Sequence, residues 1–184
     1  MCIYRLWVIN NKKINYLIIM IFHLIMSYYN NISSGYDELY KEEQLNKIKL
    51  ILQNVKINSE DKILDVGCGT GVSWDLIPTQ NIVGIDPSNE LIEKSKHKKN
   101  MILGKAEKMP LRDNEFDVVI SLTAIHNFED IKKGLIEIKR VGKDKFALSI
   151  LKKSKKLDFI KKEINKLFKV KKEINEGKDI IFII

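Results

Sequence analysis

The sequence predicts an α/β protein with a doubly wound, mostly parallel sheet, and three observations support this fold class. Short apolar runs, which are typical of buried strands, alternate with stretches of helical periodicity. The first run ends in a carboxylate and opens at once onto glycines at positions 67, 69 and 71. The second run also ends in a carboxylate, and open α/β sheets bind their ligands where the strands end. We therefore expect a ligand site at the carboxyl ends of these two strands.

The other elements follow in chain order. A helix opens near Tyr36, because apolar residues from Leu45 to Val55 recur at helical spacing. Residues 58–61 then turn the chain into the first strand at Ile63. The remaining expected elements are strands at 81–86, 101–104, 116–121 and 145–151, amphipathic helices at 131–140 and 155–168, and a closing hairpin of residues 169–175 and 179–184 around Gly177.

The glycine loop after the first strand separates two ligand classes. Gly67, Gly69 and Gly71 allow left-handed backbone angles and carry no side chain, so a ligand can lie against bare peptide groups. A dinucleotide would bring a pyrophosphate beside Asp65, where two negative charges repel each other. S-adenosylmethionine carries a sulfonium and an ammonium, which the carboxylate attracts. The loop therefore favours S-adenosylmethionine over NAD.

Asp86 ends the second apolar run, about 20 residues after the glycine loop begins. An acid at this position accepts hydrogen bonds from both ribose hydroxyls of a nucleoside cofactor. The alternative is that Asp86 only caps the next helix, since Asp and Ser beside a proline are common helix starters. Both roles are compatible if Ser88 or Asn89 caps the helix and Asp86 faces the cleft.

Four motifs lie in order along the chain: ILDVGCGTG at residues 63–71, VGIDPS at 83–88, AEKMPLRDNEFDVVIS at 106–121 and AIHNF at 124–128. With these motifs the chain resembles the class I S-adenosylmethionine-dependent methyltransferases, particularly the subgroup related to ubiquinone and menaquinone biosynthesis. The resemblance implies a Rossmann-like, three-layer sandwich whose seven-stranded sheet is mostly parallel and has an antiparallel last strand. It also implies S-adenosylmethionine as the cofactor.

The resemblance assigns cofactor-binding roles to the first two motifs. Asp65 and the loop residues Gly67, Cys68 and Gly69 would face the methionine part, and Asp86 would hold the ribose. In relatives, an aromatic residue of the leading segment closes over the cofactor. Tyr36 or Tyr40 would be that residue here, and ordinary packing against the sheet is the alternative.

The third motif is assigned to the adenine. Ala106 would offer its backbone N–H to a ring nitrogen, Glu107 would lie beside the ring, and Ser121 would line the site at the end of the fourth strand. Many relatives have Asp where this chain has Lys105, and a protonated lysine cannot accept a hydrogen bond from the adenine amino group. Either Glu107 accepts it instead, or the amino group is left to water.

The segment 121–128 is expected to line the cleft in which the methyl group meets its acceptor. It lacks the Asn-Pro-Pro-Tyr type motif of amino-directed methyltransferases, and it lacks a Pro-Cys pair that would supply a covalent nucleophile. His126 is a candidate general base. The alternative is a structural histidine at a helix start, since methyl transfer often needs only alignment.

Length and cysteine content bound the organisation of the chain. Its 184 residues fit one domain, which we place at residues 27–184. Residues 1–26 form an apolar extension that is too short for an ordinary membrane span, so membrane association is not favoured and a weak anchor is the alternative. We expect this extension to be an upstream continuation of the reading frame, with the native protein starting at Met26. Cys2 and Cys68 lie in unrelated settings, so a disulfide framework is not expected and a cytoplasmic location is favoured. The three histidines show no ligand spacing, and we predict no metal.

The net charge of +8 leaves the acceptor open. Lysines gather between residues 152 and 162, where they would neutralise the phosphates of an RNA. The chain has few arginines, which read phosphates better than lysines, so a solvated face is the alternative. We expect a methyltransferase that transfers a methyl group by direct displacement to a small-molecule acceptor. A tRNA or rRNA methyltransferase and a non-catalytic S-adenosylmethionine-binding scaffold subunit are the alternatives, and the sequence does not specify the oligomeric state.

Overall fold

The structure, a computed structural model, describes residues 41–184, and residues 43–184 form one compact unit. The described part begins within a helix that ends at residue 54. The two candidate lid residues, Tyr36 and Tyr40, and the apolar extension over residues 1–26 lie outside the described residues.

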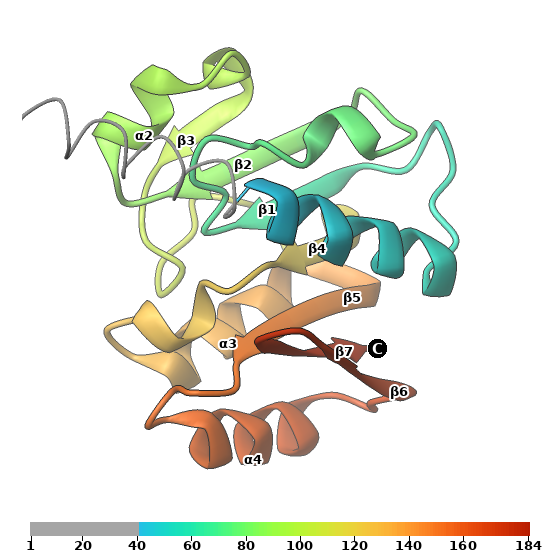
Figure 1. Ribbon diagram of the computed structural model, residues 1–184. Helices are drawn as coiled ribbons and strands as arrows, with labels where there is room; N and C mark the ends of the chain where they lie inside the picture. Colours follow the sequence, from blue (N-terminus) through green and yellow to red (C-terminus); the bar gives the residue numbers. More distant parts are fainter. Residues whose placement is uncertain (1–40) are drawn as a thin grey trace, which may run out of the picture. The chain divides into compact units, whose positions relative to one another are not determined.

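Seven strands in the described part of the chain form a single sheet in the order β3-β2-β1-β4-β5-β7-β6 (Figure 1). Every pairing from β3 to β5 is parallel, and β7 runs antiparallel to both of its neighbours. The predicted mostly parallel sheet with an antiparallel last strand is therefore confirmed. The strands are β1 (Ile63–Val66), β2 (Ile82–Asp86), β3 (Met101–Leu103), β4 (Phe116–Ser121), β5 (Gly142–Leu151), β6 (Lys172–Glu176) and β7 (Asp179–Ile183).

The strand order reverses beside β1. The chain passes from β1 outward to β2 and β3, and then returns to the other side of β1 with β4. Ile63 is consequently paired with Ile82 on one side and with Val118 on the other. Such a switch point leaves a crevice at the carboxyl ends of the strands, because the connections diverge to opposite faces. The glycine loop begins directly after β1, and thus at this crevice.

The helices follow the predicted order. They are α2 (Asn89–Lys94), α3 (Ile131–Val141) and α4 (Leu157–Leu167), with short 3₁₀ turns η1 (Trp74–Leu76), η2 (Lys98–Asn100) and η3 (Ile125–Asn127). Ser88 caps α2 by accepting a hydrogen bond from Leu91 N, as predicted, and Asp130 caps α3 in the same way through Lys133 N. None of the helices among residues 41–184 is long and apolar enough to cross a membrane.

Strand β5 starts three residues earlier than its apolar pattern suggests. Gly142 ends α3 and already pairs with Phe116, although Lys143 and Asp144 look like turn residues. A Cβ atom at Gly142 would lie 2.4 Å from the ring of Phe146, so helix and strand meet without a connecting loop only because this residue is glycine. A register shift between Phe116 and Val118 accommodates the early start.

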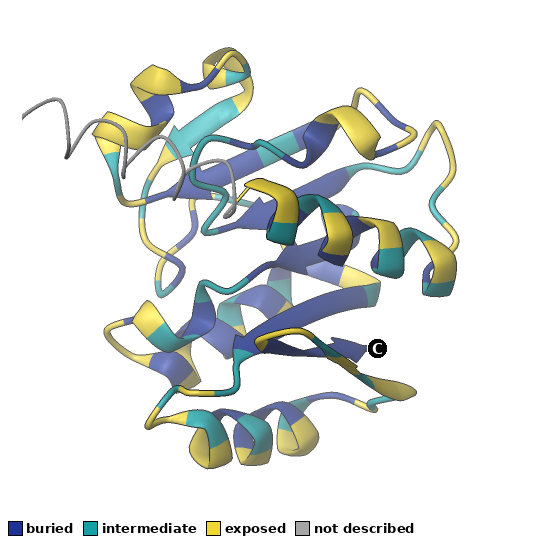
Figure 2. Cartoon of the chain, viewed as in Figure 1, coloured by how far each residue is buried: buried dark blue, intermediate teal, exposed yellow. Residues whose placement is uncertain are grey.

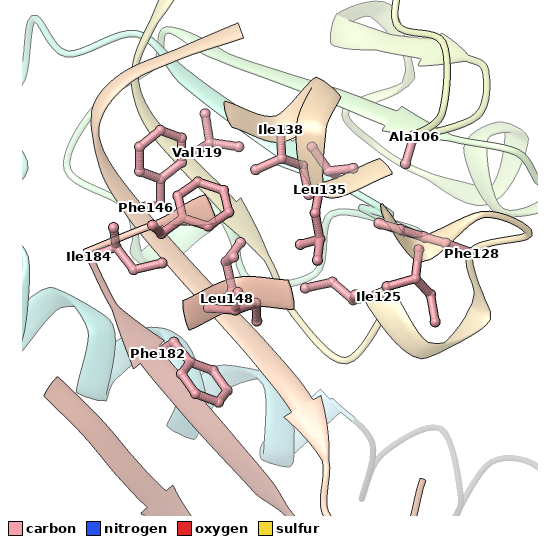
Figure 3. Packing of buried hydrophobic residues seen from close by; sticks show 14 of the residues in the cluster. Ala106, Val119, Ile125, Phe128, Leu135, Ile138, Phe146, Leu148, Phe182 and Ile184 are labelled. Atoms are coloured by element: carbon pink, nitrogen blue, oxygen red, sulfur yellow. The ribbon is translucent and has the colours of Figure 1, made fainter. Parts of the chain in front are cut away.

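The sheet has a hydrophobic core on each face, which makes the unit a three-layer sandwich. Successive residues of β1 point to opposite faces of the sheet. Leu64 lies in the core covered by α3 and α4, and Ile63 lies in the core covered by the helix that ends at residue 54. Figure 2 shows the buried sheet between exposed outer helix surfaces. In Figure 3, Leu135 and Ile138 of α3 lie in the same core as the strand residues Val119 and Leu148.

Candidate functional site

The glycine loop at the end of β1 has the left-handed backbone that its sequence predicted. The φ angles are +75° at Gly67, +55° at Gly69 and +66° at Gly71. A Cβ atom at Gly67 would lie 2.4 Å from Cβ of Ala124, in the segment that follows β4. Glycine is therefore required at this position both for its φ angle and for the close approach of a second segment.

Asp65 is buried beneath the loop, with 4% of its surface exposed. Its Oδ2 accepts a hydrogen bond from Nε1 of Trp74 at 2.8 Å. Burial raises the pKa of Asp65 to about 7, and the nearby charge of Asp86 adds to the rise, while the Trp74 hydrogen bond opposes it. A carboxyl group whose pKa lies near 7 loses its proton readily when a cation approaches, and the resulting carboxylate attracts that cation. The position therefore suits a positively charged ligand.

Asp86 ties the glycine loop to the start of α2. Its Oδ2 accepts a hydrogen bond from Gly69 N at 2.8 Å, and its Oδ1 accepts one from Ser88 N at 2.8 Å. A carboxylate has about four acceptor positions, so these two bonds leave room for further donors such as the two hydroxyls of a ribose. Both roles considered for Asp86 are thus compatible with its geometry, and the ribose contact stays a prediction.

Cys68 lies inside the loop as a free, half-buried thiol. Burial raises its pKa, and the charges of Asp65 and Asp86 raise it further. The thiol is therefore protonated at neutral pH and is a poor nucleophile. The contact of Cys68 with the cofactor stays a prediction, and in such a contact the thiol would be an uncharged side chain lining the site.

The three residues considered for the adenine differ in burial and in hydrogen-bond partners. Lys105 is exposed and forms an ion pair with Glu129, while Ala106 is buried. Oε1 of Glu107 accepts a hydrogen bond from Asp130 N at 3.2 Å, so this carboxylate already has one partner at the start of α3. The roles of Ala106 and Glu107 stay predictions. Lys105, which cannot accept a hydrogen bond from the adenine amino group, pairs with Glu129 instead.

Ser121 ends β4 and is fully buried. Its hydroxyl donates to the Val66 carbonyl at 2.8 Å, directly before the glycine loop. The side chain therefore supports the loop from beneath, and its predicted contact with the cofactor remains a prediction.

His126 lies in η3, on the segment that follows β4, and is half-buried. Its Nδ1 is buried and has no hydrogen-bond partner among the described residues. Burial lowers its pKa below the usual value, the charge of Asp179 opposes the shift, and the charges of Lys156 and Lys47 add to it. The imidazole is therefore neutral at pH 7 and has a nitrogen available for a proton or a ligand.

The structure brings Asp65, the glycine loop and Asp86 together at one edge of the sheet, and Ala124 brings the segment with His126 against the same loop. Sequence reasoning missed Trp74, the hydrogen-bond partner of Asp65. It also missed a group of buried or half-buried polar residues behind the segment after β4, consisting of Lys47, Thr123, Ser149 and Asp179. The signal for Lys47 was present, since a charged residue lies on the apolar face of the first helix, next to Ile48.

The residues present fit S-adenosylmethionine. The left-handed glycines carry no side chain, and a Cβ atom at Gly69 would have only Leu91 within 4 Å, at 3.9 Å, so the loop backbone is open there. The two neighbouring strand ends supply acids for a cation and for hydroxyl groups. Among residues 41–184, no three His, Cys, Asp or Glu side chains lie close enough together to hold a metal ion.

Comparison with known proteins agrees with this site. Residues 64–148 match a family model described as a methyltransferase domain. The chain is 34% identical over 122 residues to an uncharacterized protein of Methanocaldococcus jannaschii, covering 65% of this chain and 48% of the relative. It is 35% identical over 118 residues to the demethylmenaquinone methyltransferase of Chlorobaculum tepidum, covering 61% of this chain and 48% of the relative.

A solved structure shows the same fold. The crystal structure of a SAM-dependent methyltransferase from Aquifex aeolicus has a TM-score of 0.62 and 21% identity, and covers 77% of this chain and 89% of that chain. The match of residues 64–148 to a methyltransferase domain agrees with the resemblance seen in the sequence, and it implies S-adenosylmethionine as the cofactor. The chain spans about half the length of the curated relatives it matches.

Proposed function

We propose that this chain is an S-adenosylmethionine-dependent methyltransferase that transfers the methyl group by direct displacement to a small-molecule acceptor. The observation that carries the proposal is the arrangement at the ends of β1 and β2. There, a left-handed glycine loop lies between a buried acid, Asp65, and a second acid, Asp86, that holds the loop. This arrangement suits a ligand that is both cationic and a nucleoside.

In this proposal, residues of the chain bind the cofactor and orient it toward the acceptor. S-adenosylmethionine, when bound, supplies a methyl group on a positively charged sulfonium. Asp65 and the backbone of the glycine loop hold the methionine end, and Asp86 accepts hydrogen bonds from the ribose hydroxyls. Tyr36 is the proposed aromatic lid, and Ala106 and Glu107 are the proposed adenine contacts. Direct displacement then requires that the acceptor atom be aligned with the methyl carbon.

His126 is the proposed general base. As the acceptor atom takes the methyl group, it loses a proton, and the neutral imidazole receives that proton at its unprotonated ring nitrogen. Burial lowers the pKa of His126, so the ring is neutral at pH 7 and one of its two nitrogens is free to accept the proton. The same feature distinguishes an enzyme from a non-catalytic scaffold, because a scaffold has no use for an available base beside the cofactor loop.

A small acceptor is favoured over RNA by the lysine contacts. Three lysines of the basic stretch donate to protein groups: Lys152 to the Gly177 carbonyl, Lys156 to the His126 carbonyl and Lys161 to Glu173. Those bonds hold the three ammonium groups against the protein, and the pair with Glu173 also compensates the charge of Lys161. The small-molecule proposal also agrees with the printed name of the Chlorobaculum relative, which is a demethylmenaquinone methyltransferase. The free Cys68 thiol accords with the cytoplasmic location that we propose.

Two measurements test the proposal in sequence. Isothermal calorimetry on the full chain should show saturable binding of S-adenosylmethionine and none of NAD, and the reverse preference would overturn the cofactor assignment. The protein is then incubated with methyl-labelled cofactor and a cell extract separated into RNA, protein and small-molecule fractions. Label in the small-molecule fraction supports the proposal, label in RNA selects the RNA alternative, and binding without label in any fraction selects the scaffold.

A further inference from the structure

The segment after β4 contains the main backbone irregularity outside the glycine loop. Thr123 has a φ angle of +56°, and it is one of two non-glycine residues with positive φ in the described part of the chain. A β-branched side chain is unfavourable in this region, because its methyl group crowds the backbone. Such a conformation persists where surrounding contacts hold it, and it is often found at functional sites.

Three residues from distant segments hold Thr123 in place. Its backbone N–H donates to Oγ of Ser149, on β5, at 2.8 Å, and its Oγ1 donates to Oδ2 of Asp179, at the start of β7, at 2.6 Å. Nζ of Lys47, on the first helix, donates to Oγ1 of Thr123 at 2.8 Å. These four residues, Lys47, Thr123, Ser149 and Asp179, are called the Thr123 cluster.

The members of the cluster also contact one another through Oδ2 of Asp179, while Oδ1 of Asp179 is buried and has no hydrogen-bond partner among the described residues. Ser149 donates to Oδ2 of Asp179 at 3.1 Å, and Lys47 forms an ion pair with the same oxygen at 2.9 Å. The side chains of Lys47 and Asp179 are 2% and 0% exposed, so the ion pair is buried and water does not compete for either partner. Removal of one partner would leave a buried charge unpaired, and the cluster therefore resists rearrangement.

The next residue connects the cluster to the glycine loop. Ala124 follows Thr123 directly, and its Cβ occupies the space in which a Cβ of Gly67 would lie, 2.4 Å away. The peptide plane between Thr123 and Ala124 turns with the φ and ψ angles of Thr123. If Thr123 relaxed to a negative φ, Ala124 would move, and the loop would lose the surface against which Gly67 packs.

We propose that the Thr123 cluster positions the cofactor-binding loop. Lys47, Ser149 and Asp179 act as positioning residues that hold Thr123 in a left-handed conformation, and Thr123 in turn presses Ala124 against Gly67. None of the four touches the cofactor in this proposal. It rests on the proposed function for the identity of the ligand, whereas the effect on the loop itself is independent of any ligand.

The matched variants are Thr123→Val and Thr79→Val. Thr79 is also buried, and its hydroxyl also makes two hydrogen bonds, one to the Asp61 carbonyl and one from Asn81 N. It lies before β2, at the opposite edge of the sheet from the glycine loop. Both changes remove a hydroxyl and keep the side-chain shape, so both should lower stability in urea unfolding. Thr123→Ser keeps the hydroxyl and should behave like the unchanged protein.

The first readout is hydrogen exchange without ligand. The amides of Gly67 and Gly69 donate to the Ile85 carbonyl and to Asp86, and both should exchange about tenfold faster in Thr123→Val than in Thr79→Val. The second readout is calorimetry, in which Thr123→Val should weaken S-adenosylmethionine binding about tenfold while Thr79→Val and Thr123→Ser stay within about twofold.

Unchanged amide exchange at both glycines in Thr123→Val overturns the proposal, whether or not the protein binds S-adenosylmethionine. Equal effects of the two valine variants also overturn it, because the change would then reflect general stability. Faster exchange in a protein that does not bind S-adenosylmethionine supports the positioning role and rejects the proposed function. If Thr123→Val does not fold, Ser149→Ala, which removes the partner of the Thr123 amide, takes its place under the same criteria.

Discussion

The two loops that meet at the carboxyl edge of the sheet are held in different ways. The loop after β1 obtains its left-handed angles from glycines and its hydrogen bonds from the adjacent β2. The segment after β4 has a threonine in the same backbone region, held by side chains that lie 26, 56 and 76 residues away in sequence. The first loop is therefore encoded locally, whereas the second depends on the assembled fold.

The largest expected effect lies on the β4 side, in His126→Gln. The turnover number should fall about 100-fold, because the variant keeps a polar side chain but has no base for the acceptor proton. The affinity for S-adenosylmethionine should stay within about twofold, because the residue is assigned to the acceptor and not to the cofactor.

Steady-state kinetics with the acceptor found in the labelling experiment, together with calorimetry, measures both quantities. Asn127→Ala is the matched control, since Asn127 is an exposed neighbour in the same 3₁₀ turn. A His126→Gln enzyme with full turnover would make His126 a structural residue, as the alternative interpretation of the sequence holds.

Gly67→Ala tests whether the two loops depend on each other. The added Cβ would meet Ala124 at 2.4 Å and would also have a φ of +75°, so the free energy of unfolding should fall by about 2 to 4 kcal/mol. Gly177→Ala is the control, because it has a φ of +44° and nothing within 4 Å of an added Cβ. It should cost about 1 kcal/mol. Urea unfolding measures both, and equal losses would show that the contact with Ala124 contributes nothing.

Asp86→Ala should weaken S-adenosylmethionine binding about 30-fold, corresponding to the loss of a charged hydrogen-bond partner. The carboxylate holds Gly69 N and Ser88 N and is the predicted ribose contact, so its removal affects the loop and the ligand together. Asp75→Ala removes an exposed acid and should leave the affinity unchanged. An unaltered dissociation constant for Asp86→Ala would remove the role assigned to it.

The smallest expected effect concerns pH. Because burial raises the pKa of Asp65 to about 7, the carboxyl is mostly neutral at pH 6 and mostly ionised at pH 8. A cationic cofactor binds better to the ionised form, so its affinity should increase about threefold to tenfold over this interval. Calorimetry in matched buffers measures the slope, and Asp65→Asn should abolish it. A wild-type slope that survives in Asp65→Asn would assign the titration to another group.

The raised pKa of Asp65 also affects stability: cofactor affinity should rise with pH, whereas the stability of the free protein should fall. In the unfolded chain Asp65 ionises at its ordinary, lower pKa, so the unfolded state holds fewer protons between about pH 4 and pH 7. The contribution of Asp65 to folding therefore decreases as the pH rises through this window. The carboxylate that attracts the cofactor destabilises the protein without it, and Asp65→Asn should be more stable than the unchanged protein at pH 8.

The sequence predicted the β1 side of the site well because its signals are local. Three glycines at alternate positions and an acid near each strand end are visible in short windows, and the glycines have the expected left-handed backbone angles. The cofactor contacts of these residues stay predictions. The mostly parallel sheet with an antiparallel last strand was also expected, because the resemblance to methyltransferases implies it.

The contacts that hold Thr123 on the β4 side were not predicted, for a physical reason. Asp179 looks like a hairpin turn residue beside Gly177, and the position of Lys47 beside Ile48 is a signal for a buried charge that does not identify its partner. Their burial becomes favourable only when β5, β7 and the first helix assemble around Thr123, and no short window of sequence contains that arrangement. The early start of β5 was missed for a related reason, because the pairing of Gly142 with Phe116 outweighs the polar residues that follow it.

Trp74 makes this site observable by light. Its indole N–H donates to Asp65 at 2.8 Å, and its ring lies 5.1 Å from that of His97. Indole emission responds to a charge placed next to the ring, so ionisation of Asp65 should change the emission maximum and the intensity of Trp74 fluorescence. The sequence has two tryptophans, Trp7 and Trp74, and Trp7→Phe leaves a single emitter. Proton release and ligand entry can then be followed in real time by the intrinsic fluorescence of one side chain.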